Sequence, residues 1–341
     1  MLTIILPGTT HRIRSLSDWP AGAPNLAGVT VSQDASGADT AAVPVLDVGG
    51  THVTCAAVHV GRRQIRAGAQ HRLRADAPAE EILHRLIDCA GQVPGPIGSV
   101  WGVAMPGPCD YSRGIALFEG VGKFDALYGF DLQRELLQRL PGAPTRVRFL
   151  NDAAAFVLGE SVAGAAVGHS RVIGITLGTG VGSAFLADGQ LVDQGPGVPP
   201  KAAVHLLTFA GRPLEDTVSE RAIRARYARA ASAEATVLTV REIAARARAG
   251  DVDAQRVLSD ALTALGRVLA PLVVGFGATM LVVGGSMTRS WDLVARPLVN
   301  GIAALAPQTV DGLVVAPSRR PAQSTLLGAA LHAADRVPDS A

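Results

Sequence analysis

The residues best suited to chemistry begin at position 45, where Val-Leu-Asp-Val-Gly-Gly-Thr joins an apolar run to a carboxylate and a glycine pair. The pattern predicts a buried strand that turns tightly into a second strand at Gly49 and Gly50. Glycines let the backbone N–H groups of such a turn approach phosphate oxygens closely. Asp47 is then placed to bind a divalent cation.

A second glycine turn, Gly-Thr-Gly-Val-Gly, spans residues 178–182. It is not the dinucleotide fingerprint, because residue 183 is serine and the following residues predict a strand. It is not a Walker A motif either. A hairpin of this kind can enclose phosphates with its N–H groups, or it can be an ordinary turn; the sequence leaves both readings open.

An Asn151-Asp152 pair stands where a predicted strand, 147–150, ends and a helix begins. Ligands of α/β folds collect at such carboxyl ends of strands. The helix N-terminus and an ordinary pKa near ~3.9 would keep Asp152 ionised at neutral pH. An ionised carboxylate can accept a hydroxyl proton as the oxygen attacks phosphorus. The pair can equally be a simple helix N-cap.

Predicted strands and helices alternate in two blocks, each of which begins with a strand and a glycine turn. This order predicts an α/β chain with two lobes. Strands are expected at 43–60 (a pair), 100–105, 147–150, 171–188 (a hairpin) and 280–283. Helices are expected at 78–91, 131–140, from 151 to about 166, over most of 219–276 with a loop near 231–237, and at 324–335.

Composition excludes several functional classes. The chain has 341 residues and a net charge of +2, which argues against a nucleic-acid partner. The three cysteines are widely spaced, so neither a disulfide framework nor a thiolate zinc site is expected, and a reducing cytoplasm fits. No uninterrupted apolar run is long enough to span a bilayer, and the run at 2–6 lacks the basic lead of a signal peptide.

The ordered set Asp-Val-Gly-Gly-Thr, Pro-Gly-Pro, Asn-Asp-Ala, Leu-Gly-Thr-Gly-Val-Gly and Val-Val-Gly-Gly-Ser resembles the sugar-kinase/actin/Hsp70 superfamily. It looks most like the bacterial ROK family of repressors and sugar kinases, over residues 43 to about 335. The resemblance implies a two-lobed, actin-like ATPase fold (ribonuclease H-like) with the active-site cleft between the lobes. The expected parts are an N-terminal arm or linker (1–42), a small lobe (43–150) to which a C-terminal helix at about 322–337 returns, and a large lobe (151–321).

The same resemblance implies an ATP- and Mg²⁺-dependent kinase that phosphorylates the exocyclic primary hydroxyl of a sugar or sugar-like polyol, namely a hexose, an aminosugar or a C7-cyclitol. It makes Asp152 the general base and Asp47 the Mg²⁺ ligand. The implied phosphate and nucleotide contacts are Gly49, Gly50, Thr51, Gly178, Thr179, Gly180, Gly284 and Gly285. The implied sugar contacts are Asn151, Pro106, Gly107, Lys123, His205 and Glu215.

Departures from the family pattern put the acceptor in doubt. ROK kinases usually carry a cysteine-rich zinc motif, whereas residues 203–215 contain no cysteine, so no zinc is expected. Ala202 stands where an acidic sugar contact is usual. His205 can contact the sugar or be a structural histidine. Lys123 replaces a family asparagine and can reach a hydroxyl or lie solvated at the surface.

Two other functional classes stay open. One is a ROK-type sugar-sensing transcriptional regulator, although the residues before Asp47 show no amphipathic helix pair for a helix-turn-helix. The other is a non-catalytic sugar- or nucleotide-binding protein, against which the intact Asp47 and Asp152 weigh. The expected partner is a small-molecule sugar or cyclitol, with no nucleic acid and no membrane, in the cytoplasm. A homodimer follows from family analogy alone.

Overall fold

The computed structural model describes residues 2–6, 9–13, 31–33, 41–231 and 238–334. The chain forms two compact units, Met1–Ala41 and Ala42–Ala341. In the first unit one strand pairs antiparallel with two others. These strands are β1 (Leu2–Leu6), β2 (Thr9–Ile13) and β3 (Val31–Gln33). The expected apolar strand is β1; most of the expected linker lies outside the described residues.

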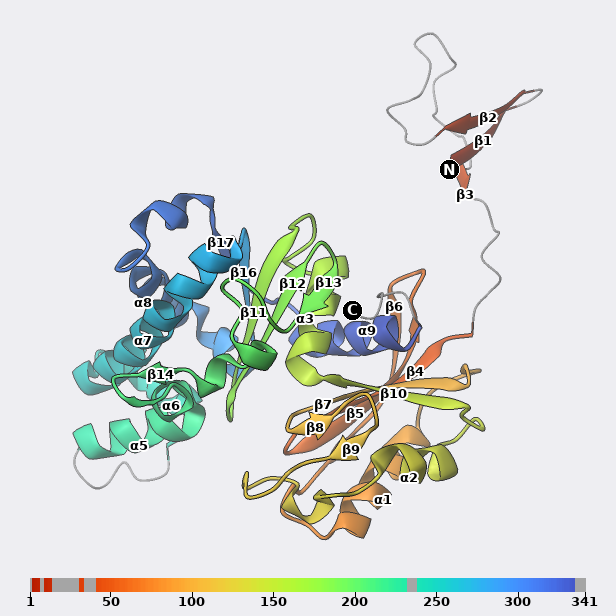
Figure 1. Ribbon diagram of the computed structural model, residues 1–341, viewed down its shortest axis with the longest axis horizontal. Helices are drawn as coiled ribbons and strands as arrows, with labels where there is room; N and C mark the ends of the chain where they lie inside the picture. The colour runs from red at the N-terminus through yellow and green to blue at the C-terminus, as the bar shows by residue number, and fades with distance from the viewer. Residues whose placement is uncertain (1, 7–8, 14–30, 34–40, 232–237, 335–341) are drawn as a thin grey trace. The chain divides into compact units, whose positions relative to one another are not determined.

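Two five-stranded sheets frame the second unit, and both have the same strand order (Figure 1). In each sheet three consecutive antiparallel strands are extended by two parallel strands, which add beside the first. One sheet contains β4 (Val43–Val48), β5 (His52–His59), β6 (Gln64–Arg72), β7 (Val100–Met105) and β10 (Arg146–Asn151). The other contains β11 (Arg171–Leu177), β12 (Val181–Ala187), β13 (Gln190–Val192), β16 (Met280–Gly284) and β17 (Val314–Pro317). The repeated order confirms the two-lobed, actin-like α/β fold.

The first sheet and its helices form the small lobe. The core helices are α1 (Ala79–Ala90) and α2 (Leu132–Arg139), whose apolar faces pack on a cluster that includes Trp101 and Phe149. The same lobe contains the short elements β8 (Cys109–Asp110), β9 (Ile115–Ala116) and η2 (Asp125–Leu127). Because α1 carries buried side chains three and four residues apart, its helical spacing was visible in the sequence.

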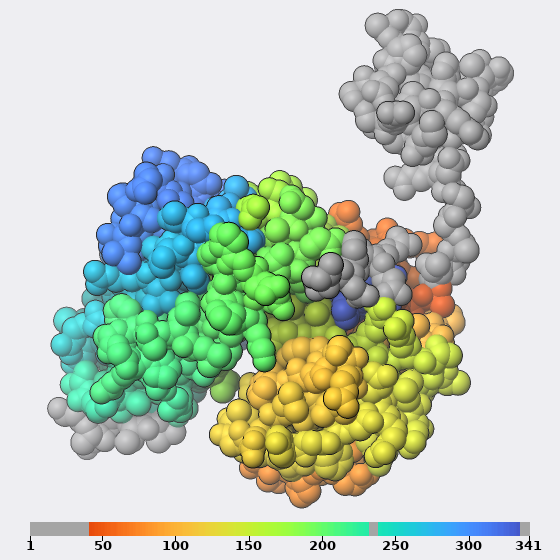
Figure 2. All heavy atoms as spheres, in the orientation of Figure 1, coloured from red at the N-terminus to blue at the C-terminus, as the bar shows by residue number. Residues whose placement is uncertain are grey.

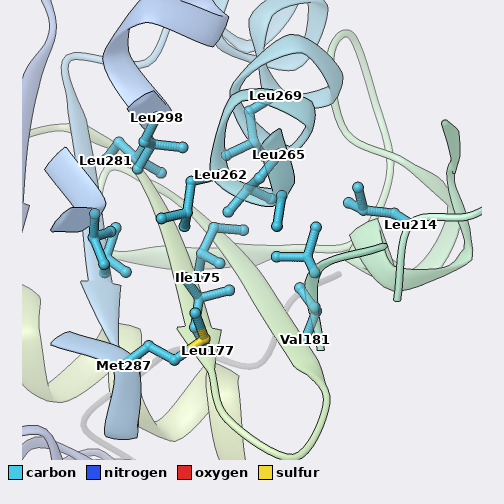
Figure 3. Packing of buried hydrophobic residues seen from close by; sticks show 14 of the residues in the cluster. Ile175, Leu177, Val181, Leu214, Leu262, Leu265, Leu269, Leu281, Met287 and Leu298 are labelled. Atoms are coloured by element: carbon cyan, nitrogen blue, oxygen red, sulfur yellow. The ribbon is translucent and has the colours of Figure 1, made fainter. Parts of the chain in front are cut away.

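The second sheet forms the large lobe with the helices that follow it. Figure 3 shows how Leu262, Leu265 and Leu269 of one long helix interlock with sheet residues such as Ile175 and Leu281. The helices are α4 (Glu215–Val218), α5 (Glu220–Ala230), α6 (Val240–Arg248), α7 (Val252–Phe276) and α8 (Trp291–Ala303). The short elements are η3 (Pro200–Ala202), η4 (Val204–Leu206), η5 (Ser286–Ser290), η6 (Pro307–Gly312), β14 (Thr208–Phe209) and β15 (Arg212–Pro213).

Helix α7 is long and apolar enough by composition to cross a membrane. More than half of its apolar stretch (56%) is nevertheless buried inside the protein. Its buried residues belong to the large-lobe core. A long helix that packs its apolar face on a sheet is expected to be buried in this way.

Two helices, α3 (Asp152–Ala163) and α9 (Pro321–Ala333), lie between the two sheets (Figure 1). They pack on each other, and α9 also contacts β4, β7 and β10 of the small lobe. The buried core around them includes Val45 from one sheet and Val282 from the other. Both helices are apolar on nearly all sides, as expected for helices enclosed by protein. We propose that the lobes divide at the start of α3, with α9 returning to the small lobe.

Most expected elements match the structure, with differences at their ends. The C-terminal helix begins at Pro321, three residues before the expected Ser324, because proline is well suited to a first helical position. Strands β6 and β17 and helix α8 were not expected from the sequence. The expected loop near 231–237 and the helix end beyond 334 fall largely outside the described residues.

Candidate active site

A cavity of about 780 Å³ is lined by residues of both lobes. The cavity lies within the second unit. Figure 2 shows one face of this unit, on which a hollow separates green segments from yellow segments. Asp47 of the first sheet, Asp152 at the start of α3, and Thr176 and Gly285 of the large lobe all line the cavity. The structure therefore brings together two carboxylates that the sequence separates by about a hundred residues.

Asp47 lies near the end of β4, opposite Thr54 of β5 and next to Ala104 of β7. The turn that follows is closed by the N–H of Gly49, which donates to the carbonyl of His52 over 2.8 Å. Burial raises the pKa of Asp47 to about 7, and the nearby charge of Asp152 adds to the effect. A carboxylate this costly to ionise is suited to a positive partner.

Asp152 is the first residue of α3. The side chain of the N-cap, Asn151, accepts from the N–H groups of Ala153 (3.0 Å) and Ala154 (3.2 Å). The N–H of Ala153 also donates to Asp152 Oδ1 over 2.9 Å. Despite this bond, burial raises the pKa of Asp152 above its usual value. The expectation of an ordinary pKa for this carboxyl is therefore wrong, since desolvation outweighs the helix terminus.

Lys123 is close enough to Asp152 for its positive charge to lower the pKa of that carboxyl, in opposition to burial. Its loop is held on both sides. The N–H groups of Val121 and Gly122 donate to the carboxylate of Asp125 over 3.1 and 3.2 Å, and the next residue, Phe124, is fully buried. Lys123 itself is half-buried. Lys123 thus lies near Asp152 without being fully exposed, and its contact with a substrate hydroxyl stays a prediction.

Tyr111 joins the expected sugar-side residues, although sequence reasoning missed it. The amide of Asn151 donates to its hydroxyl over 3.0 Å, and that hydroxyl donates to the carbonyl of Met105 over 3.2 Å. A side chain at Gly107 would meet the same hydroxyl at 3.3 Å. Tyr111 therefore ties the Met105-Pro106-Gly107 segment to the N-cap of α3. Only 3 tyrosines occur in the chain, which is the one signal that could have drawn attention to it.

Glu215 lies beside the glycine turn of residues 178–182. Its Oε1 accepts from the N–H of Val181 over 3.2 Å, and a side chain at Gly180 would meet this oxygen at 2.3 Å. The same turn is fastened by the N–H of Glu220, which donates to the carbonyl of Gly178 over 3.0 Å. In this structure Glu215 orders the turn, and its expected sugar contact stays a prediction.

His205 lies half-buried in η4, three residues after Ala202, the last residue of η3. The described contacts of this segment are made by its backbone: the N–H of Val204 donates to the hydroxyl of Ser183 over 3.0 Å. None of the described residues hydrogen-bonds to the His205 imidazole. The predicted contact of His205 with the sugar and the alternative of a structural histidine therefore both stay open.

Gly284 and Gly285 end β16 beside the cavity. Gly285 has a φ of +88°, and a Cβ there would lie 2.2 Å from the carbonyl oxygen of Leu177. Only glycine fits this position, because the backbone is left-handed and a neighbouring strand lies against it. The turn leads into Ser286, which lines the cavity and lies 3.7 Å from the position of a Cβ on Gly178. The two large-lobe glycine turns thus adjoin.

A family model described as the ROK family matches residues 44–336. This chain belongs to the ROK family. A glucokinase of Thermotoga maritima is 26% identical over 315 residues, covering 86% of this chain and 97% of that protein. A β-glucoside kinase of Klebsiella pneumoniae is 25% identical over 257 residues, covering 72% of this chain and 82% of that protein.

The fold of this ROK protein also matches a solved relative. The ROK glucokinase of Streptomyces griseus, in complex with glucose and AMPPNP, has a TM-score of 0.70 and 23% identity. The match covers 86% of this chain and 99% of that chain. At this identity the likeness establishes the shared fold, and it agrees with the duplicated sheet order described above.

The donor set of this ROK protein fits a magnesium ion better than a zinc ion. Magnesium is usually bound by one or two carboxylates together with substrate phosphates, and Asp47 and Asp152 supply carboxylates. Structural zinc needs about four cysteine or histidine ligands. Over the described ranges, no three His, Cys, Asp or Glu residues cluster as a ready metal site. The absence of zinc stays a prediction.

We expect the stability of the metal-free protein, compared with an Asp47→Asn variant, to fall as the pH rises from about 4 to about 7. The unfolded chain releases the Asp47 proton near pH 3.8, whereas the folded protein keeps it to about 7. The native state therefore binds more protons in this window, and rising pH costs it at most about 4 kcal/mol. Urea unfolding in the presence of a chelator at pH 4.5 and 8 measures the difference; an equal difference at both pH values would contradict the assignment.

Proposed function

We propose that this ROK protein is an ATP-dependent kinase that transfers the γ-phosphoryl group to the exocyclic primary hydroxyl of a sugar or sugar-like polyol. The observation that carries the proposal is the meeting of Asp47 and Asp152 in one cavity, bordered by the large-lobe glycine turn that contains Gly285. The kinase relatives support the same reaction class. ATP use is supported by the AMPPNP bound to the Streptomyces griseus glucokinase.

In this mechanism Asp152 accepts the proton of the acceptor hydroxyl as its oxygen attacks phosphorus. The raised pKa of Asp152 makes it a stronger base than an exposed aspartate. The positive charge of Lys123 opposes part of this rise in pKa. The N–H groups of the turns at 49–51 and 178–180 bind the phosphate oxygens, and closure of the lobes excludes water. Mg²⁺, held by Asp47, would neutralise charge on the transferring phosphoryl group.

The expected acceptor-binding site differs from that of a plain hexose kinase at two positions. Ala202 supplies no carboxylate, and the segment between His205 and Glu215 has no cysteine to order it by zinc. Lys123 instead provides a cation near Asp152. The lost carboxylate is one that usually accepts from sugar hydroxyls, so an aminosugar and a cyclitol stand beside a plain hexose as candidate acceptors.

A panel assay tests this proposal. The protein with ATP and Mg²⁺ should release ADP when supplied with at least one of glucose, N-acetylated hexosamines or C7-cyclitols, and mass spectrometry should show phosphate on the exocyclic oxygen. Failure of every acceptor on the panel to stimulate ADP release would count against the proposal. Phosphate on a ring hydroxyl would overturn the regiochemistry alone.

The regulator alternative has less support. The described residues of the first unit form strands β1, β2 and β3, and include no helix-turn-helix. A sharp DNA footprint with the full chain would revive that alternative.

A further inference from the structure

Three arginines line the same cavity as the two carboxylates: Arg289 from η5, and Arg319 and Arg320 from the loop before α9. All three are exposed to the cavity or to solvent. Across the described part of the chain, no carboxylate lies within ion-pair distance of any of them. Like charges held together without an anion repel one another, so this arrangement is suited to an anionic ligand.

The N-terminus of α9 opens onto the same cavity. The helix begins at Pro321, and its N-cap, Arg320, makes no capping hydrogen bond through its side chain. Ala322 and Gln323, in the first turn, both line the cavity. The N–H groups of a first helical turn have no partner within the helix, and they carry the positive end of the helix dipole. The N-terminus of α9 therefore adds to the positive electrostatic potential that the three arginines create in the cavity.

The arginine-bearing segment is fixed at both ends by one buried carboxylate. Ser318 and Ser324 both donate to Oε1 of Glu160, over 2.5 and 2.6 Å. Glu160 is only 1% exposed, and its other oxygen accepts from the N–H of Ala165 over 2.8 Å. Because Arg319 and Arg320 lie between these two serines, their backbone is held in place before any ligand arrives. A binding loop ordered in advance loses less entropy when it binds.

We propose that Arg289, Arg319 and Arg320 bind the oligophosphate chain of the phosphoryl donor, a role that rests on the proposed kinase function. Guanidinium groups form paired, charge-assisted hydrogen bonds with phosphate oxygens. The three arginines line the same cavity as Asp47 and Asp152. The chain can belong to ATP or to inorganic polyphosphate, since both present the same repeating phosphates.

The test measures binding of AMPPNP and of inorganic tripolyphosphate to the full chain by calorimetry, without an acceptor. The double variant Arg319→Gln/Arg320→Gln and the single variant Arg289→Gln should each lower the affinity for both ligands about 10- to 100-fold. Arg319→Lys/Arg320→Lys should lose less, because it keeps the charge. Arg241→Ala, which removes an exposed arginine of α6, is the matched control and should leave both affinities unchanged.

Two binding results would overturn the inference. Unchanged affinity of both ligands in the double variant would show that the arginines do not touch the phosphates. Weaker binding of AMPPNP with unchanged binding of tripolyphosphate would show that the arginines contact the nucleoside instead. Because Arg289 comes from a different element, its variant keeps the test valid if the double variant unfolds.

Turnover separates this inference from the proposed function. With ATP and polyphosphate compared as donors, the double variant should raise the KM of whichever donor supports turnover at least about 10-fold. An unchanged donor KM would overturn the inference while the kinase function stands. Tripolyphosphate binding that depends on the arginines, without phosphorylation of any acceptor, would overturn the kinase function and show only that the arginines bind an oligophosphate chain.

Discussion

Replacing Asp152 by asparagine should lower kcat by about 10²- to 10⁴-fold, the contribution typical of a positioned general base. Asparagine keeps the shape of the side chain and an oxygen that can accept from the N–H of Ala153. The N-cap of α3 is made by Asn151 and is unaffected. The loss should therefore fall on proton transfer, with AMPPNP affinity kept within a few-fold.

Steady-state kinetics with the best acceptor and calorimetry with AMPPNP separate the two effects. Asp131→Asn is the matched control, because Asp131 caps α2 in the small lobe and is not among the residues lining the cavity. It should leave kcat near the wild-type value. An Asp152→Asn enzyme that retains most of its turnover would remove Asp152 from the role of base, and with it the central step of the mechanism.

Replacing Gly159 or Gly328 by alanine should destabilise the protein by about 1–3 kcal/mol or more, the cost of overpacking a closed interface. A Cβ at Gly328 would lie 1.8 Å from the carbonyl oxygen of Ala155, and a Cβ at Gly159 would lie 1.9 Å from that of Ser324. These are backbone atoms, so the two helices would have to move apart. In an open helix the same change would stabilise by about 1 kcal/mol, so the expected sign is opposite to that of helix propensity.

Thermal unfolding of each variant measures the effect as a lower Tm. Gly61→Ala is the control, because a Cβ there meets nothing within 4 Å and its backbone is not left-handed. A Gly328→Ala protein at least as stable as wild type would show that α3 and α9 do not pack as closely as the structure indicates. Helix α9 packs on the small-lobe sheet and α3 faces both sheets. A loss of activity in either variant at unchanged ATP affinity would therefore also indicate that closure of the two lobes is disturbed.

Local sequence was enough to predict the segments that carry the two carboxylates. The strand and turn around Asp47 and the cap at Asn151 depend on neighbouring residues: apolar β-branched side chains, glycines without a Cβ, and short side chains that cap a helix. The hairpin at 171–188 was predicted for the same reason. The order of these segments along the chain was also enough to indicate the fold and the family.

Residues that act across the fold were not predictable in this way. Tyr111, Glu160 and the arginine pair at 319–320 have no periodicity or motif around them that indicates a partner. Glu160 lies in the helix expected from residue 151 to about 166, but Ser318 and Ser324, its partners, are more than 150 residues away. The shift of the pKa of Asp47 likewise comes from its burial and from Asp152, neither of which is local.

The sequence by itself determined which turns and helix ends this ROK protein forms, because these depend on backbone freedom and hydrogen bonds within a few residues. Only the tertiary structure decided what faces the cavity. The crossing of α3 and α9 at Gly159 and Gly328 sets how the two lobes meet, and therefore which distant side chains share one space. Packing of this kind depends on the shapes of surfaces far apart in the chain, which no local pattern records.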